Sequence, residues 1–247
     1  MFRKRSFTNK RTKFLIVFLI WIMLMGVGYA YLSTTLTISG SVGVDAYVPP
    51  SGRAVTNADI GKYVDLGKDV IGTTATDDDW RVLWVDETNS QTYLILADFL
   101  PASKMPTATG ITNNGSYSVY ANDNRDQLLN YMLTSSNWNS LIDSSIQGAT
   151  VTGGPTKEVV EASYQAKYGG SWNTTTAQAD TLLVSHNASW NSCNGYWLAS
   201  PDAGYDSAVW CVYYYGDFGY DYYGSTYYGV RPVVCLSSDI PLNIVDE

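Results

Sequence analysis

The stretch that decides the fold runs from residue 195 to residue 236 and reads GYWLASPDAGYDSAVWCVYYYGDFGYDYYGSTYYGVRPVVCL. Between Tyr213 and Tyr228 it contains eight tyrosines and one phenylalanine, separated by Gly, Asp, Ser and Thr. Each buried tyrosine hydroxyl needs a hydrogen-bond partner, so a core rarely uses this many. We therefore expect most of these rings to be at least partly exposed, and an exposed aromatic patch typically marks a binding surface.

The composition of this stretch favours recognition. Tyr, Ser, Gly and Asp are the residues that antibody paratopes use, because they combine rigid rings with adaptable polar contacts. If Trp210 and Val212 point inward, strand alternation turns Tyr213 and Tyr215 to the other face. The alternative is a twisted hairpin whose cross-strand aromatic pairs only stabilise the sheet. The predicted ligand-binding residues are Tyr205, Asp206, Tyr213, Tyr215, Asp217, Tyr220, Tyr222, Tyr223, Ser225 and Tyr227.

Charge is distributed unevenly along the chain. The formal net charge is −8, yet the first thirteen residues carry six cations and no acid. Without those six, 9 basic residues remain against 23 acidic ones, a net charge of −14. Such a body repels phosphate backbones, so nucleic acid is not an expected partner.

Residues 14–32, FLIVFLIWIMLMGVGYAYL, are uncharged and follow the basic flank. Nineteen such residues suffice for a membrane-spanning helix whose basic side stays in the cytoplasm. The alternative is a signal peptide cleaved after Ala30, at a small-x-small site. Both interpretations export the rest of the chain, which is then either anchored in the cell membrane with an extracellular domain or secreted. Residues 33–58 are rich in Ser, Thr, Gly and Pro and are predicted to form a linker.

The remaining chain predicts a mixed α+β domain. Alternating and apolar runs indicate a hairpin around the turn at residues 86–91, buried on both faces, and helices carry i,i+4 apolar pairs. Segment 173–194 is polar and is expected to be mostly loop, and Pro232 must sit at an edge, a bulge or a strand start. The predicted strands and helices are strands 60–66, 80–85, 92–97, 196–199, 208–215 and 220–236, the last broken around Gly224 and Gly229, and helices 122–133 and 156–168.

The three cysteines, Cys193, Cys211 and Cys235, make an odd count that does not indicate a disulfide framework. Cys211 and Cys235 lie in apolar runs, which favours buried free thiols, with one disulfide plus a leftover thiol as the alternative. The chain has no CxxC pair and a single histidine, His186, so neither a metal nor a cofactor is predicted.

Residues that could suggest catalysis have simpler explanations. His186 lies in a polar segment without a nucleophile elbow, so a loop residue is expected rather than a catalytic base. The acidic run at residues 77–79 lacks the alternating ligands of a calcium loop and is interpreted as a solvated turn. Arg231 either contacts an acidic ligand or is a partly buried residue paired with an acid, and the second interpretation is favoured. We therefore expect no enzyme.

Short motifs near the carboxy terminus carry a family resemblance. Residues 196–201 read YWLASP, Trp210 and Val212 stand one residue apart, Gly216 follows, and residues 228–233 read YGVRPV. The chain resembles a group of uncharacterised bacterial surface domains that end in tyrosine-tryptophan-leucine-x-serine-proline, a Tyr/Ser/Gly-rich hairpin and glycine-valine-arginine-proline. Upstream, residues 80–83 (WRVL), 94–96 (LIL) and 124–130 (NRDQLLN) resemble the first hairpin and first helix of that group.

That group looks like a C-type-lectin-type fold, similar to the variable ligand-binding proteins of diversity-generating retroelements and distantly to formylglycine-generating enzymes. The resemblance implies small antiparallel sheets flanked by two helices, with the Tyr-rich hairpin carrying the ligand. It also implies that Trp210, Val212, Arg231 and Pro232 belong to the scaffold. The calcium triplets of lectins and the paired cysteines of the formylglycine-generating enzymes are not matched, so metal-dependent sugar binding and oxidase activity are not carried over.

The expected organisation is therefore a basic flank with a membrane or signal segment (1–32), a linker (33–58), a C-type-lectin-like domain (59–239) and a tail (240–247). The expected function is an exported surface binding protein that recognises a protein or glycan through its Tyr-rich hairpin. The alternatives are a self-associating matrix protein and an enzyme acting on envelope glycan.

Overall fold

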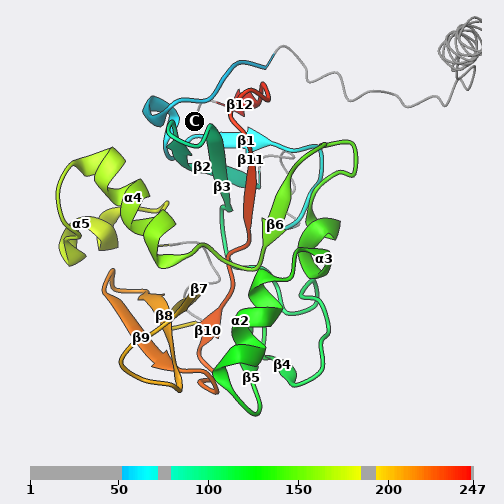
Figure 1. Cartoon of the computed structure of the whole chain (residues 1–247), viewed down its shortest axis with the longest axis vertical. Helices are drawn as coiled ribbons and strands as arrows, with labels where there is room; N and C mark the ends of the chain where they lie inside the picture. Colours follow the sequence, from blue (N-terminus) through cyan, green and yellow to red (C-terminus); the bar gives the residue numbers. More distant parts are fainter. Residues whose placement is uncertain (1–51, 72–78, 185–192, 246–247) are drawn as a thin grey trace, which may run out of the picture. The chain divides into compact units, whose positions relative to one another are not determined.

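The centre of the protein is the hairpin predicted around residues 86–91. The computed structural model describes residues 52–71, 79–184 and 193–245, and in it β2 (Trp80–Asp86) pairs with β3 (Gln91–Leu96) (Figure 1). The Asp86 carboxylate accepts hydrogen bonds from the backbone N–H groups of Thr88 and Asn89, which closes the turn. Nearly every residue of β2 is buried, which confirms the prediction of a hairpin covered on both faces.

Four further strands extend this hairpin into a six-stranded sheet with the order β12-β1-β2-β3-β11-β6 and antiparallel neighbours throughout. Pro232 directly precedes β11, so its missing N–H costs no ladder hydrogen bond, as predicted. The added strands are β1 (Tyr63–Asp65), β6 (Thr150–Thr152), β11 (Val233–Ser237) and β12 (Asn243–Val245).

The tyrosine-rich stretch belongs mainly to a second sheet of four strands, with the order β10-β7-β8-β9. The return over residues 220–236 is interrupted near Gly224 and Gly229, as expected, but its pieces do not stay in one hairpin: the chain forms β9, then β10 parallel to β7, and then enters the larger sheet as β11. A third sheet is a two-stranded hairpin. The strands of these two sheets are β7 (Gly195–Pro201), β8 (Ala208–Tyr213), β9 (Phe218–Tyr222), β10 (Tyr228–Gly229), β4 (Ile111–Asn114) and β5 (Ser118–Ala121).

Both predicted helices form, and each begins where its capping residue stands. Asn124 accepts a hydrogen bond from the Gln127 N–H at 3.0 Å to begin α2 (Arg125–Leu133). Thr156 caps α4 (Lys157–Tyr168) in the same way, and α4 ends at Gly169, whose φ of 65° lies in the left-handed region. The shorter helices are η1 (Asn57–Asp59), α3 (Ser135–Trp138), η2 (Asn139–Leu141) and α5 (Thr174–Ala179).

The two faces of the six-stranded sheet support two apolar cores. Leu83 and Ile95 pack in a cluster with Val160 of α4, whereas Val82 and Leu94 pack in a cluster with residues of α2 and α3. Strand alternation explains the division, because neighbouring residues of β2 and β3 point to opposite faces. The four-stranded sheet contributes to both cores, so the tyrosine-rich hairpin is attached to each of them.

Several expectations are corrected. Residues expected to form a loop contain α5, and residues expected to form a tail contain β12, which pairs with β1. At the other end, Arg53 forms a β-bridge with Leu242, so residues expected to be linker also pack with the sheet. Asp79 is buried rather than solvated, and its carboxylate accepts hydrogen bonds from the Val70 and Ile71 N–H groups.

The protein is thus a mixed α+β domain with several small antiparallel sheets and few helices, as the sequence predicted. Among the helices of the described residues, none has the length and apolarity needed to cross a bilayer. The expected membrane or signal segment at 14–32, the cleavage position after Ala30, and His186 lie outside the described residues.

Cysteine chemistry follows burial. All three cysteines are free; Cys193 and Cys211 are buried and Cys235 is half-buried. Burial raises the pKa of the Cys193 thiol to about 11 and that of the Cys211 thiol to about 12. Because the thiolate is the reactive form, these two cysteines are inert core residues at neutral pH.

Arg231 is the most buried charged residue of the described chain and lies where the sheets meet. Its guanidinium donates hydrogen bonds to the carbonyls of Leu96 (2.9 Å), Ala97 (3.2 Å) and Leu182 (2.7 Å), and it lies 5.3 Å from the ring centroid of Tyr196. The expectation of a scaffold role is met, but its hydrogen bonds run to backbone carbonyls rather than to an acid. Burial lowers the pKa of Arg231, and the carbonyls offset the loss of hydration.

The variant Arg231→Lys tests this role. Lysine has three donors at one point and cannot reproduce the planar fork that reaches three carbonyls. We expect the free energy of unfolding to fall by at least about 2 kcal/mol, because hydrogen bonds to charged groups contribute roughly 1.5–3 kcal/mol each. Chemical denaturation followed by tryptophan fluorescence measures the change, and wild-type stability of the variant would contradict the role.

Candidate functional site

The β8–β9 hairpin presents aromatic rings on one of its faces. In the register of this pair Trp210 is opposite Tyr220 and Val212 is opposite Phe218, so these side chains share a face. Ring centroids of Trp210 and Tyr220 are 5.8 Å apart, those of Trp210 and Phe218 5.5 Å, and those of Tyr220 and Tyr205 5.1 Å. We call Tyr205, Trp210, Phe218 and Tyr220 the aromatic face.

A cation from α4 lies on this face. The Lys157 Nζ atom is 3.7 Å from the ring centroid of Trp210 and 5.8 Å from that of Phe218. Glu161, one turn further along α4, forms an ion pair with Lys157 at 3.9 Å. Trp210 is half-buried beneath the lysine and packs against the apolar cluster that contains Val160 and Val212, as expected of a scaffold residue. The face therefore combines rings with a paired cation and carboxylate.

Two groups hold the Tyr205 loop in place. The buried Asp202 carboxylate accepts hydrogen bonds from the N–H groups of Gly204 at 2.8 Å and Tyr205 at 3.0 Å. From α2, the Arg125 guanidinium donates to the carbonyls of Asp202 (3.0 Å) and Tyr205 (3.2 Å). The exposed Tyr205 ring is thus carried on a loop whose backbone is fixed at both its N–H and C=O groups.

The turn of the hairpin is held against α5. Gly216 has φ of 82°, and a Cβ atom added there would lie 2.4 Å from the Gln178 nitrogen and 2.5 Å from the Thr174 carbonyl oxygen. Trp172 donates its indole N–H to the Gly216 carbonyl at 3.0 Å, and its ring lies 4.8 Å from that of Phe218. The contacts of α5 and Trp172 with the turn fix the position of the hairpin.

The opposite face of the hairpin packs in the core that also contains residues of α2 and α3. The buried Tyr228 donates a hydrogen bond from its hydroxyl to the Asp221 carboxylate at 2.7 Å. The centroid of its ring lies 4.4 Å from that of Trp197 and 5.8 Å from that of Tyr213. Burial and the Asp221 carboxylate raise the pKa of Tyr228 far above its usual value, and burial raises the pKa of Tyr213 to about 12. Tyr213 therefore has a packing role, although the sequence suggested that it faces a ligand.

The other predicted tyrosines form two small groups. Tyr215 stacks on Tyr213 with centroids 5.1 Å apart, and Tyr222 lies 4.3 Å from Tyr223. Tyr223 is half-buried and donates its hydroxyl to the Asp123 carbonyl. Tyr222 and Tyr215 are exposed. The predicted tyrosines therefore do not form one surface.

The remaining predicted residues serve the turns or stand alone. The Asp217 carboxylate accepts a hydrogen bond from the Phe218 N–H at 3.0 Å and so shapes the hairpin turn. Ser225 donates its backbone N–H to the Tyr222 carbonyl. Asp206 is exposed, and Tyr227 is the most exposed large aromatic side chain described, at 60 %.

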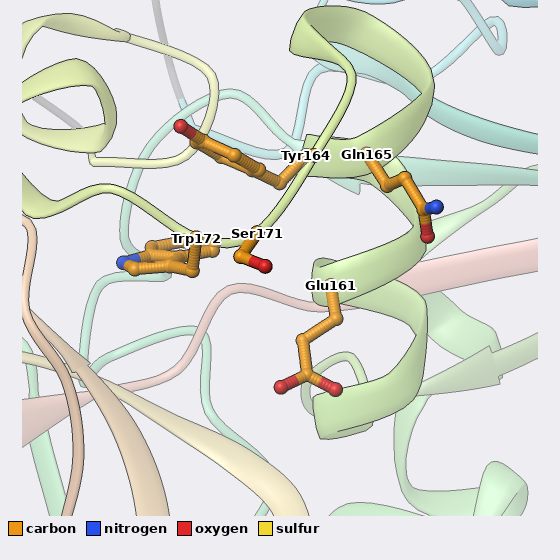
Figure 2. A pocket seen from close by; sticks show the side chains of 6 residues that line it. Glu161, Tyr164, Gln165, Ser171 and Trp172 are labelled. Atoms are coloured by element: carbon orange, nitrogen blue, oxygen red, sulfur yellow. The ribbon is translucent and has the colours of Figure 1, made fainter.

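A pocket of about 370 Å³ lies beside Trp172, between α4 and the loop that follows it (Figure 2). In this view the Tyr164 ring lies on one side of the Trp172 indole and the Glu161 carboxylate on the other. The ring contact between Trp172 and Phe218 joins the pocket to the aromatic face. The lining residues are Glu161, Tyr164, Gln165, Gly170, Ser171 and Trp172.

Sequence reasoning missed the contributions of α4 and its following loop. It assigned Lys157, Glu161 and Trp172 no role, because each approaches the hairpin only through the tertiary fold. The turn at residues 202–204 (Asp-Ala-Gly) did carry a local signal, since an aspartate two residues before a glycine is typical of a side-chain-closed turn. Among the described residues, no group of three or more metal-binding side chains comes together.

The YWLASP motif has a structural explanation. Tyr196 donates its hydroxyl to the Leu183 carbonyl at 2.9 Å, and Trp197 donates its indole N–H to the Val119 carbonyl at 2.8 Å. Ser200 accepts a hydrogen bond from the Lys157 N–H at 2.9 Å and thereby helps to begin α4. These motif residues fix the frame around the aromatic face rather than form it.

Comparison with known proteins adds one finding. A family model described as a domain of unknown function, DUF6273, matches residues 150–238, less than half of the chain. This segment contains α4, the pocket loop, the hairpin and Arg231. No curated protein and no solved structure matches the chain.

Gly216→Ala tests whether the turn is held by α5. We expect the free energy of unfolding to fall by about 3 kcal/mol or more, because a left-handed backbone costs roughly 1–2 kcal/mol and an overpacked contact roughly 1–3 kcal/mol. Thermal or chemical denaturation measures the change.

Gly115→Ala is the matched control. Gly115 also has positive φ, 58°, but an added Cβ there meets nothing within 4 Å. The free energy of unfolding of this variant should fall only by the cost of the left-handed backbone, about 1–2 kcal/mol. Equal losses in the two variants would show that contact with α5 does not constrain the hairpin.

Proposed function

We propose that this protein is a non-catalytic binding module that recognises a protein or glycan ligand through the aromatic face and the exposed Tyr222 beside it. The observation that carries the proposal is that exposed rings stand on a backbone fixed from several sides. Tyr205 is 56 % exposed and Tyr220 41 %, while Asp202, Arg125 and α5 hold the backbone beneath them.

Rigid, exposed rings suit recognition for an energetic reason. A side chain that is ordered before binding loses little conformational freedom on association, so more of its contact energy appears as affinity. The neighbouring Lys157–Glu161 pair adds polar contacts beside the rings. We further propose that the domain has a C-type-lectin-type fold. The protein would be exported and either held at the cell surface or secreted.

Self-association is the second candidate, and the position of β9 favours it. In the order β10-β7-β8-β9 this strand lies at the edge of the sheet, with β8 as its one ladder partner among the described strands. An edge strand can pair with another copy of the chain. The exposed tyrosines of the hairpin would then lie between copies.

The double variant Tyr205→Ala/Tyr220→Ala tests ligand recognition. Full-length protein is applied to a printed glycan array and to an array of surface proteins. We expect the wild type to bind defined members and the variant to lose at least about tenfold in affinity, as when central aromatic residues of an interface are removed. Thermal stability should change little, because both tyrosines are surface residues outside the two apolar clusters.

Tyr63→Ala is the control, since Tyr63 lies on β1 of the other sheet. It should bind as the wild type does. Retained binding by the double variant, or loss of binding by the control as well, would contradict recognition through the aromatic face.

Dilution separates recognition from self-association. Light scattering of full-length protein across a wide concentration range should give one constant mass for a binding module. A mass that falls on dilution, and falls less for Tyr205→Ala/Tyr220→Ala, would instead support assembly through the hairpin.

A further inference from the structure

We propose that the pocket beside Trp172 is a subsite for one neutral sugar residue of a glycan that also lies on the aromatic face. This inference rests on the proposed function and narrows its ligand from protein or glycan to glycan. The evidence is the chemistry of the pocket lining, the charge around it and its connection to the hairpin.

The indole of Trp172 forms one side of the pocket. Trp172 is half-buried, and its indole is held by the ring of Tyr164 at 4.9 Å, the ring of Phe218 at 4.8 Å and the hydrogen bond to Gly216. A pyranose has an apolar C–H face that packs on an aromatic ring, so a fixed indole suits it. The volume, about 370 Å³, lies at the lower end of the roughly 300–1,000 Å³ typical of small-ligand pockets.

The rest of the lining is polar and complements hydroxyl groups. Glu161 supplies a carboxylate that accepts, Gln165 an amide that both donates and accepts, and Ser171 a hydroxyl that does both. All three side chains belong to exposed residues, so a ligand reaches them without displacing the core (Figure 2). One ring with several hydrogen-bonding groups is the mixture that a sugar requires, whereas an apolar peptide side chain would leave these groups unpaired.

Charge selects a neutral sugar over an acidic one. Glu161 is the charged group in the pocket lining, and its ion pair with Lys157 leaves no surplus of positive charge there. The chain also carries a net charge of −8. A uronic acid or sulfated residue would be repelled by the carboxylate, while a neutral or N-acetylated hexose is not.

A row of ring contacts connects Trp172 in the pocket lining to the aromatic face. Trp172 contacts Phe218, Phe218 contacts Trp210, and Trp210 contacts Tyr220 through successive ring pairs with centroids 4.8, 5.5 and 5.8 Å apart. Tyr205 extends the row beyond Tyr220. An extended glycan can therefore place one residue in the pocket and further residues over the hairpin.

Calorimetric titration with trisaccharides tests the subsite. Full-length protein is titrated with maltotriose, cellotriose, mannotriose and chitotriose, and with trigalacturonate as the acidic counterpart. We expect at least one neutral trisaccharide to bind and trigalacturonate not to bind. In Glu161→Ala/Gln165→Ala the affinity for that sugar should fall by about tenfold or more, the loss expected when hydrogen bonds to a charged acceptor are removed.

Glu158→Ala is the matched control, because Glu158 is an exposed glutamate on the same helix outside the pocket. It should bind like the wild type, and denaturation curves should show all variants folded. The subsite is overturned if no neutral trisaccharide binds, if trigalacturonate binds best, or if Glu161→Ala/Gln165→Ala binds like the wild type.

The variant Tyr205→Ala/Tyr220→Ala separates this result from the proposed function. If only Tyr205→Ala/Tyr220→Ala (the hairpin variant) loses affinity for the trisaccharide, the aromatic face is supported and the subsite is overturned. If only Glu161→Ala/Gln165→Ala (the pocket variant) loses affinity, the subsite is supported and recognition through the aromatic face is overturned. Loss by both supports one continuous glycan site.

Discussion

The arrangement of the two larger sheets depends on one buried guanidinium. Arg231 lies in the chain between β10 and β11. It donates hydrogen bonds to the carbonyl of Leu96 at the end of β3 and to that of Leu182 in the segment after α5. Its guanidinium also lies over the ring of Tyr196 on β7. A buried charge is tolerated only with nearly complete hydrogen bonding, so its partners must keep their places. The six-stranded sheet, the four-stranded sheet and the segment after α5 are thereby fixed relative to one another.

The elements that the sequence predicted well carry their own local signals. The β2–β3 hairpin has long apolar strands around a polar turn that begins at Asp86, and α2 and α4 have capping residues followed by apolar pairs at helical spacing. The three-residue strands β6 and β12 are too short to show a period, and they exist because β11 and β1 offer them an edge. The six-residue α5 has only Ala177 and Ala179 as apolar residues, too few to show a helical period, and it packs through the buried Ala177 and its contact with Gly216.

The candidate site was predictable in kind but not in detail. Composition alone indicated exposed tyrosines, and Tyr205, Tyr220, Tyr222 and Tyr227 are exposed. Which face of the hairpin they occupy depends on what covers the other face, and the sequence does not state that Tyr213 packs against Tyr228. The positions of Lys157 and Trp172 beside the hairpin result from the packing of α4, which no local pattern reveals.

The manner in which the hairpin is fixed has an evolutionary consequence. Its supports act on main-chain atoms: α5 on Gly216, Trp172 on the Gly216 carbonyl, and Arg125 and Asp202 on the backbone around Tyr205. Side chains on the solvent-facing positions of β9 can therefore change without moving the strand that carries them. For the proposed binding module, this means that substitutions at these positions would alter ligand preference at nearly constant stability.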